Sequence, residues 1–184
     1  MEQSTKVVTG KVRFSYANVF EPTAMSDKDT PKYNVSILIP KSDTETLEKI
    51  KKAIEAAKQA GKAKLADKNG KIPADAALKM PLRDGDIERP DDEAYAGHFF
   101  INANSSKRPS IVNKDLQEII SRDEFYSGCY GRASISFYAF NVNSKGIACG
   151  LNNLQKLEDG EPLAGGSSAQ EDFGGENAWE DPLM

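Results

Sequence analysis

The sequence is poor in the residues that build metal and redox sites. Its 184 residues include two cysteines, Cys129 and Cys149, and one histidine, His98. A structural zinc site usually takes four Cys or His ligands at short spacing, which three scattered residues cannot supply. A single histidine without a partner also gives no catalytic triad. We therefore expect two small buried thiols in a reducing compartment, with no metal site, no catalytic residue and no cofactor.

Long apolar runs are absent as well. No stretch approaches the roughly 18 residues that span a bilayer, and residues 1–6 contain no apolar export segment. The sequence therefore predicts a cytoplasmic protein that does not contact a membrane. Its hydrophobic content of 39% and mean hydropathy of −0.56 are low, which predicts that part of the chain adds polar length without adding core.

Basic residues are missing from the end of the chain. The last 27 residues, 158–184, hold eight acids and no Lys or Arg, so this segment carries −8. The remaining 24 basic and 20 acidic residues give residues 1–157 a charge of +4. We therefore divide the chain into a mildly basic folded domain, residues 1–157, and a flexible, disordered acidic tail, residues 158–184.

The acidic tail ends in large apolar side chains. A tail that only solvates the protein needs neither the single Trp of the chain nor a terminal Pro-Leu-Met. Aromatic anchors among carboxylates are typical of segments that bind a basic partner with pockets, although a purely solvating tail remains the alternative. The candidate partner-binding residues are Phe173, Trp179, Glu180, Asp181, Leu183 and Met184.

Strand patterns dominate the folded domain. The clearest helix pattern begins at the capping box Ser42-Asp43-Thr44-Glu45 and ends at Gly61, and residues 73–95 predict a long loop. Several strands with one inserted helix predict a mainly β protein, an antiparallel barrel of the oligonucleotide-binding (OB) fold. The expected strands are 6–16 with a bend at Gly10, 33–39, 97–103, 110–113, 130–142 and, after a hairpin turn at 143–146, 147–151.

Acidic residues crowd one part of the predicted loop. The acids there are Asp84, Asp86, Glu88, Asp91, Asp92 and Glu93, and paired carboxylates can hold Mg²⁺ for phosphodiester cleavage. A Pro- and Gly-rich loop is nevertheless a poor scaffold for fixing two metals. No phosphate-binding loop, dinucleotide fingerprint or nucleophile elbow is present. A solvated loop is the favoured interpretation, and a Mg²⁺-dependent nuclease is the alternative.

Basic and aromatic residues are interleaved in the predicted strands and their loops. Single-stranded nucleic acid requires this mixture, because phosphates need cations and exposed bases stack on flat side chains. Phe14, Phe99, Phe137 and Phe140 are expected to fill the interior, since Phe has no polar tip. The candidate binding residues are Arg13, Tyr16, Lys32, Tyr33, Lys107, Arg108, Tyr126, Tyr130 and Arg132.

The segment Tyr126-Ser-Gly-Cys-Tyr-Gly-Arg132 combines two glycines with two tyrosines and an arginine. Glycines at such positions allow a nucleic-acid backbone or base to approach closely. The alternative is an ordinary strand entry bent by its glycines.

Three stretches resemble a phage family of single-stranded-DNA-binding proteins. They are Tyr33-Asn-Val-Ser-Ile-Leu-Ile-Pro-Lys41, Tyr126-Ser-Gly-Cys-Tyr-Gly-Arg132 and, as the most specific, Lys145-Gly-Ile-Ala-Cys-Gly-Leu-Asn-Asn-Leu-Gln-Lys156. The resemblance implies an OB barrel with an inserted helix. It also implies an acidic tail that recruits replication enzymes such as a polymerase, helicase or primase, although this tail lacks the terminal Phe of similar tails.

We predict a non-enzymatic, sequence-independent binder of single-stranded DNA that acts in phage replication or recombination, in the cytoplasm of a bacterial host. A domain that binds only proteins is a second alternative beside the nuclease. RNA binding also stays open, since stacking and phosphate contacts do not by themselves detect the 2′-hydroxyl. Weak self-association stays open as well.

Overall fold

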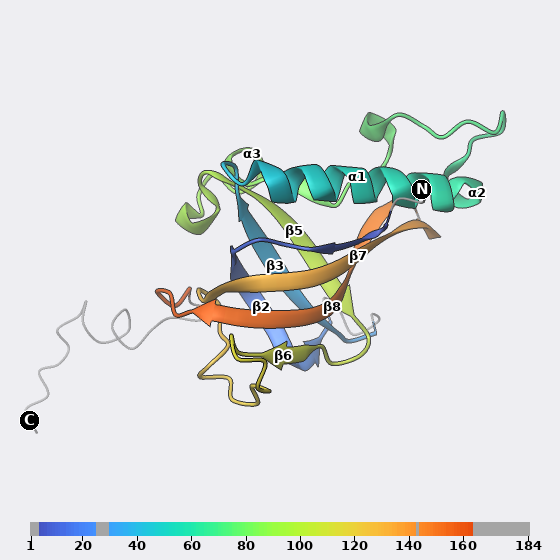
Figure 1. Cartoon of the computed structure of the whole chain (residues 1–184). Helices are drawn as coiled ribbons and strands as arrows, with labels where there is room; N and C mark the ends of the chain where they lie inside the picture. The colour runs from blue at the N-terminus through green and yellow to red at the C-terminus, as the bar shows by residue number, and fades with distance from the viewer. Residues whose placement is uncertain (1–3, 25–29, 143, 164–184) are drawn as a thin grey trace, which may run out of the picture.

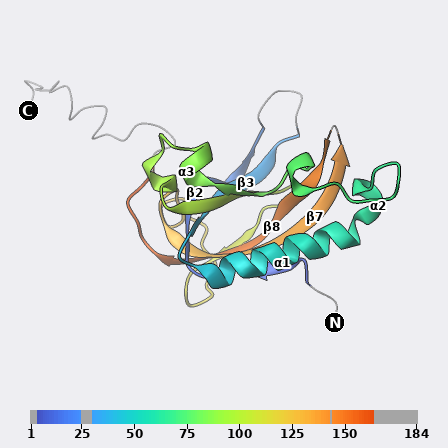
Figure 2. The same cartoon turned by 90° about the horizontal axis from the view of Figure 1, so that it is seen from above.

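The computed structural model describes residues 4–24, 30–142 and 144–163. Its strands form one sheet in the order β1-β7-β2-β3-β5-β8-β6, and β4 pairs with β5. Because β7 also pairs with β8, the strands close a ring, with α1 lying along one side (Figures 1 and 2). The strands are β1 (Lys6–Val8), β2 (Val12–Thr23), β3 (Lys32–Pro40), β4 (Leu82–Asp84), β5 (His98–Ser105), β6 (Ser110–Val112), β7 (Tyr130–Val142) and β8 (Ser144–Glu158).

Within the described residues, three helices accompany the ring. They are α1 (Thr44–Ala60) and two single-turn helices, α2 (Lys62–Leu65) and α3 (Gly85–Glu88). Two short 3₁₀ turns, η1 (Asp75–Ala77) and η2 (Glu93–Tyr95), lie in the segment between α2 and β5. The prediction of a mainly β, OB-like protein with a long inserted helix is confirmed. The prediction of a featureless loop over residues 73–95 was wrong, since this segment contains β4, α3 and both 3₁₀ turns.

Most strand pairs are antiparallel, and the exceptions involve β8. This strand pairs in parallel with β5 and β6, and antiparallel with β7 along almost its whole length. At the β7–β8 turn, Val142 pairs with Ser144, and residue 143 lies outside the described residues. Lys145 and Gly146 were predicted to form part of the turn. They pair with Asn141 and Phe140 instead, because the β7–β8 ladder continues up to Val142 and Ser144. The predicted turn was therefore too long.

The interior of the ring is filled by side chains of alternating strand positions. Ile135 and Phe137 of β7 are buried, whereas the intervening Ser134 and Ser136 point outward, as the strand period predicts. Phe14 is fully buried, but Phe99 and Phe140, also predicted for the interior, are only half-buried. Phe140 shares the outward period of Ser134 and Ser136 on β7, so its prediction as an interior residue was wrong. Phe99 packs against the core, but it lies close to the start of β5, where the ring covers side chains less completely.

Helix α1 closes one side of the ring with Ile50, Ala53 and Ala57, and Gly61 follows it as the predicted C-cap. Its N-cap is Asp43, whose carboxylate accepts from the Thr46 N–H at 3.2 Å, so the predicted cap at Ser42 was wrong by one residue. The Thr46 hydroxyl in turn accepts from the N–H of Gly10 at 2.9 Å. This bond ties the start of the helix to the bend between β1 and β2.

Both cysteines, Cys129 and Cys149, are free and buried, as expected for small core side chains. Burial raises the pKa of each thiol. Among the helices of the described part of the chain, none combines the length and apolar character that a membrane span requires.

Two glycines of the β7–β8 pair give a test of the packing. A methyl group at Gly131 would collide with the backbone carbonyl of Gln155, whereas one at Gly150 would find its nearest neighbours, in Ser136 and Tyr138, at 3.6 Å. We expect Gly131→Ala to lower the free energy of unfolding by about 1–3 kcal/mol, the usual cost of overpacking. Gly150→Ala should leave it nearly unchanged. Urea denaturation of both variants measures the difference, and equal stabilities would contradict the described register.

Candidate nucleic-acid interface

The outer face of β2, β3 and β5 carries rows of aligned polar side chains. Val35 and Ile37 of β3 point into the core, so the alternate residues of this strand point outward. The strand register extends the outward positions across neighbouring strands. The resulting rows are Ser15–Ser36–Asn102, Asn18–Asn34–Asn104 and Thr23–Lys32.

A groove of about 740 Å³ lies over this face. We call it the sheet groove. Its walls combine one tyrosine, two cations, and several amides and hydroxyls, and its described lining residues include no carboxylate. Its polar and aromatic lining includes Tyr16, Asn18, Thr23, Lys32, Asn34, Arg89, Asn102 and Asn104.

An irregularity in β2 directs Tyr16 into the sheet groove. The pairing of β2 with β3 shifts between Ser15 and Asn18, and Tyr16 adopts a positive φ of 48°. The Ser127 hydroxyl accepts from the Ala17 N–H at 2.9 Å, and the Asn18 amide donates to the Tyr16 carbonyl at 3.2 Å. Bulges re-aim side chains, and a non-glycine residue at positive φ often marks a functional position. Tyr16 is 47% exposed as a residue, so part of its side chain is accessible to a ligand in the groove.

Arg89 lines the sheet groove next to Tyr16. It follows α3, and its guanidinium lies 5.8 Å from the ring centre of Tyr16, 5.6 Å from that of Tyr95 and 5.9 Å from that of Phe100. These distances are within the range of cation–π attraction. Sequence patterns did not point to Arg89, because it lies in a segment whose periodicity predicted only a loop.

An ion-pair cluster holds this segment against the sheet. The Lys41 ammonium lies 2.8 Å from carboxylate oxygens of both Asp84 and Asp86, and Asp86 also accepts from the Gly97 N–H at 3.0 Å. Hydrogen bonds from Lys41 lower the pKa of both carboxyls, which in turn raise the pKa of Lys41. The two acids that began the predicted nuclease site are thus bound to a lysine. Across the described residues, no three His, Cys, Asp or Glu side chains gather as a metal site would require.

The floor of the sheet groove is a hydrogen-bonded row of amides. The Asn18 amide donates to the Asn34 side-chain oxygen at 2.9 Å, and the Asn34 amide donates to the Thr23 hydroxyl at 2.9 Å. The Asn34 amide also donates to the Lys32 carbonyl at 3.1 Å, so both donors of Asn18 and of Asn34 are used within the floor. This network fixes the two amides in place and leaves their side-chain oxygens with acceptor capacity for a ligand.

Three of the predicted binding residues contact the start of the acidic tail instead of open solvent. Residues 158–163, which we call the tail root, lie across Arg13, Tyr126 and Tyr130. The Arg13 guanidinium donates to the Glu161 carbonyl at 2.8 Å and lies 5.3 Å from the Tyr130 ring centre. The Tyr126 hydroxyl donates to the Asp159 carboxylate at 2.9 Å.

Further contacts fix the tail root. Asp159 pairs with Lys156 at 2.6 Å, and hydrogen bonds from Lys156 and Tyr126 lower its pKa. The Leu163 N–H donates to the Ser127 carbonyl at 2.8 Å, and the Leu163 side chain packs on a small cluster that includes Tyr95. The tail, predicted to begin at residue 158, therefore lies on the folded domain as far as residue 163.

The glycines of segment 126–132 make room for the protein's own backbone. A side chain at Gly128, which has a φ of +115°, would collide with the Glu161 carbonyl, and one at Gly131 with that of Gln155. The close approach expected from these glycines is therefore present, but the approaching chain is the tail root and β8.

The remaining predicted residues lie outside the sheet groove. Tyr33 shares the inward-facing period of Val35, so it lies on the opposite face of β3 from Lys32. Lys107 is exposed after β5, and Arg108 lies over the ring of Phe20, 5.3 Å from its centre. The tail residues Phe173, Trp179, Glu180, Asp181, Leu183 and Met184 lie outside the described residues.

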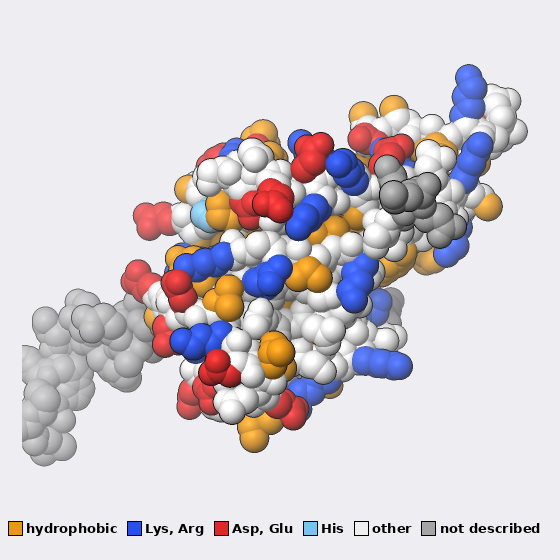
Figure 3. All heavy atoms as spheres, viewed as in Figure 1, with side chains coloured by type: hydrophobic (Ala, Val, Ile, Leu, Met, Phe, Trp, Pro, Cys, Tyr) orange, Lys and Arg blue, Asp and Glu red, His pale blue; other side chains and the backbone are white. Residues whose placement is uncertain are grey.

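Arg132 belongs to a different face. It projects from β7 and donates to the Thr9 carbonyl at 2.8 Å. On the face formed by β1, β7 and β8, Lys and Arg side chains are spread singly among polar ones (Figure 3). This distribution differs from the sheet groove, where cations, a tyrosine and amides line one hollow.

A ring of strands with an exposed aromatic, cations and amides in a surface groove defines a protein of the oligonucleotide-binding class. Comparison with known proteins makes this assignment specific. The family described as "Enterobacter phage Enc34, ssDNA-binding protein" matches residues 5–183, and the chain belongs to this family.

Individual relatives agree with the family assignment. Protein p50 of Acyrthosiphon pisum secondary endosymbiont phage 1 is 33% identical over 169 residues, which cover 89% of each chain. The single-stranded DNA-binding protein of bacteriophage Enc34, solved in complex with ssDNA, is 26% identical with a TM-score of 0.74, over 89% of this chain and 95% of that one. The protein gp2.5 of bacteriophage T7 shares the fold at 14% identity, with a TM-score of 0.61 over 97% of both chains.

The attachment of the tail root can be tested through one hydroxyl. Tyr126→Phe removes the bond to Asp159 and the bond accepted from the Gly160 N–H at 3.1 Å. At about 1 kcal/mol for each of the two lost hydrogen bonds, we expect the amides of Gly160 and Leu163 to exchange with solvent about thirtyfold faster. Hydrogen exchange followed by NMR measures this change. Tyr138→Phe, at an exposed tyrosine of β7, is the control, and equal exchange in both variants would contradict the attachment.

Proposed function

We propose that this protein binds single-stranded DNA without sequence preference and without catalysing a reaction, during phage DNA replication or recombination in the cytoplasm of the bacterial host. The observation that carries the proposal is the sheet groove, where Tyr16 is exposed at a bulge beside Lys32 and Arg89. The solved complex of the Enc34 relative with ssDNA supports this choice of ligand.

In this proposal, base stacking and phosphate contacts together hold the DNA in the sheet groove. A base stacks on Tyr16, which contributes about 1–3 kcal/mol for each base stacked on an aromatic ring. Lys32 and Arg89 neutralise phosphates and release counterions, so affinity falls as salt concentration rises. The Asn34 side-chain oxygen can accept from base amino groups, and the amides of Asn102 and Asn104 can both donate to and accept from base edges, which does not select one base.

The other predicted binding residues have smaller roles in DNA binding. Arg13, Tyr126 and Tyr130 contact DNA only after the tail root moves, because residues 158–163 already occupy them. Lys107 and Arg108, which follow β5, add charge beside the path of the strand, whereas Arg132, on the face of β1, β7 and β8, adds only to the positive charge of the folded domain. Tyr33 lies on the inward-facing side of β3, so we assign it no stacking role in the sheet groove.

The tail adds a second activity to the proposal. Phe173, Trp179 and Leu183 lie among acids, a combination that suits a basic pocket on a polymerase, helicase or primase. The same acids compete with phosphates for the cations of the folded domain. DNA binding then frees the tail for its partner.

The groove proposal predicts distinct effects of two substitutions. Tyr16→Leu should weaken oligo-dT binding about tenfold, within the range for one stacked base. Lys32→Gln should weaken it less and lower the salt slope of log Kd by about one, since one phosphate contact is lost. Salt-titrated fluorescence anisotropy measures both, with Lys49→Gln on α1 as a charge-matched control.

Parallel titrations separate the alternatives. Oligo-rU and duplex DNA test the choice of nucleic acid, and labelled DNA incubated with Mg²⁺ tests for nuclease activity. Wild-type affinity in both Tyr16→Leu and Lys32→Gln would reject the sheet groove as the site. An absence of oligo-dT binding at low salt would reject the function itself and favour a domain that binds only proteins.

The tail proposal predicts opposite effects of one truncation on two ligands. Deleting residues 164–184 leaves the tail root in place and removes five acids, so DNA binding should tighten most at low salt. The same truncation should abolish binding to the replication polymerase or helicase of the phage. Anisotropy and surface plasmon resonance measure the two affinities. Unchanged or weaker DNA binding would reject the competition.

A further inference from the structure

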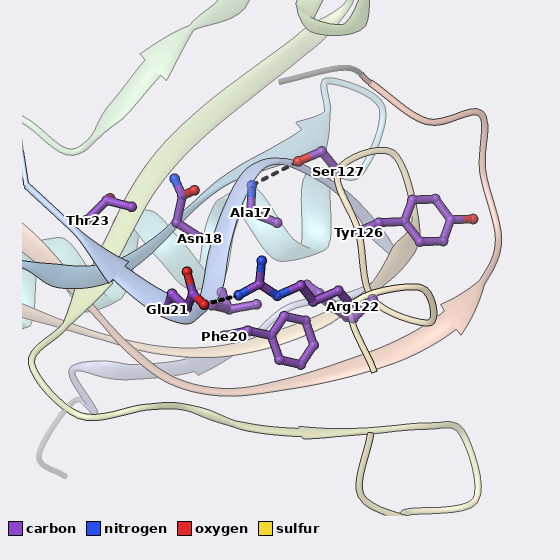
Figure 4. A pocket seen from close by; sticks show the side chains of 10 residues that line it. Ala17, Asn18, Phe20, Glu21, Thr23, Arg122, Tyr126 and Ser127 are labelled. Atoms are coloured by element: carbon purple, nitrogen blue, oxygen red, sulfur yellow. Dashed lines mark hydrogen bonds and ion pairs between the residues drawn. The ribbon is translucent and has the colours of Figure 1, made fainter. Parts of the chain in front are cut away.

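A second hollow lies beside the sheet groove. It has a volume of about 240 Å³ and lies against β2 and the segment before β7, and we call it the β2 pocket. Asn18 and Thr23 line both hollows, so the two meet at the end of β2. Its lining includes Asn18, Phe20, Glu21, Thr23 and Arg122 (Figure 4).

The β2 pocket is lined by the ring of Phe20 and the side chain of Arg122, and a second arginine, Arg108, lies near the same ring without belonging to the lining. Phe20 is half-buried, and the guanidinium of Arg108 lies 5.3 Å from its ring centre. Arg122 extends past the same ring to form an ion pair with Glu21 (Figure 4). Two arginines and a flat ring are the groups that bind a phosphate and a base of unpaired nucleic acid.

The ion pair across the β2 pocket is easily opened. The side chains of Arg122 and Glu21 are 63% and 73% exposed, and exposed pairs contribute little to stability. A DNA phosphate that binds Arg122 takes the place of the Glu21 carboxylate, so the guanidinium keeps an oxygen partner throughout. Glu21 therefore occupies the arginine in the free protein and at the same time repels the phosphates of DNA.

We propose that the β2 pocket is an extension of the DNA path, which takes a nucleotide of the strand that leaves the sheet groove. The inference rests on the proposed single-stranded-DNA function. The base of this nucleotide stacks on the accessible part of Phe20, and its phosphates bind Arg108 and Arg122. Because Asn18 and Thr23 belong to both hollows, the two hollows are direct neighbours, and a strand that leaves one reaches the other within the span of these residues.

The extension predicts that its residues affect only oligonucleotides long enough to reach it. OB folds bind about 4–16 nucleotides, so a dT series of about 4 to 16 nucleotides spans the transition. Arg122→Gln and Phe20→Leu should leave the shortest bound oligonucleotide unaffected and weaken the longest about fivefold or more. Glu21→Gln should strengthen binding of the longest. Anisotropy at constant salt measures the affinities.

The pair Lys49–Glu45 of α1 supplies matched controls. Lys49→Gln and Glu45→Gln change the net charge by the same amounts in an exposed ion pair on a different element. Their effects should be smaller than those of Arg122→Gln and Glu21→Gln and should not depend on length. The urea midpoint shows whether Phe20→Leu is folded, and Arg122→Gln tests the proposal at a surface position in either case.

The outcomes separate this inference from the function on which it rests. If Tyr16→Leu weakens binding while Arg122→Gln and Phe20→Leu have no effect at any length, the sheet groove stands and the extension is rejected. Equal weakening of short and long oligonucleotides also rejects an extension. If the wild-type protein binds no oligo-dT, the proposed function fails, and the β2 pocket fails with it.

Discussion

The register of β3 between β2 and β5 is the constraint on which the rest of the structure depends. Strand residues alternate between the two faces of a sheet, so a slip of one position would turn every polar side chain of the groove into the core. The register instead aligns Asn34 with Asn18 and Asn104, and Lys32 with Thr23. The closed ring buries most of the opposite face. On the outer face, Leu38 and Phe100 pack against Tyr95, and the part that this cluster leaves uncovered can carry binding groups.

Two segments from elsewhere in the chain decide how much of that face stays open. The segment around α3, held by Lys41, covers one end with Tyr95 and brings Arg89 over the groove. The tail root covers the neighbouring surface and bonds to Arg13 and Tyr126. Between them the sheet groove remains, with its cations and without a carboxylate among its described lining residues. The acidic tail thus starts beside the basic groove.

The sequence predicts local features well and long-range contacts poorly. Alternation identified the strands, and the same alternation already grouped Tyr33 with the inward Val35 and Ile37, although charge and aromatic content alone made it a binding candidate. Arg89 could not be found, because its position depends on a segment with no periodicity of its own. Nor could the bonding of Arg13 to the Glu161 carbonyl be foreseen, since the two residues are 148 positions apart in sequence.

The central claim, that unpaired DNA lies on the outer face of β2, β3 and β5, can be tested most directly by NMR. Asn34 and Asn102 lie in the sheet groove, whereas Asn152 and Asn153 lie on β8, outside it. During titration with a short oligo-dT, the side-chain amide signals of Asn34 and Asn102 should shift, and those of Asn152 and Asn153 should remain in place. Shifts at the two β8 asparagines alone would place the DNA on the other face and contradict this description of the protein.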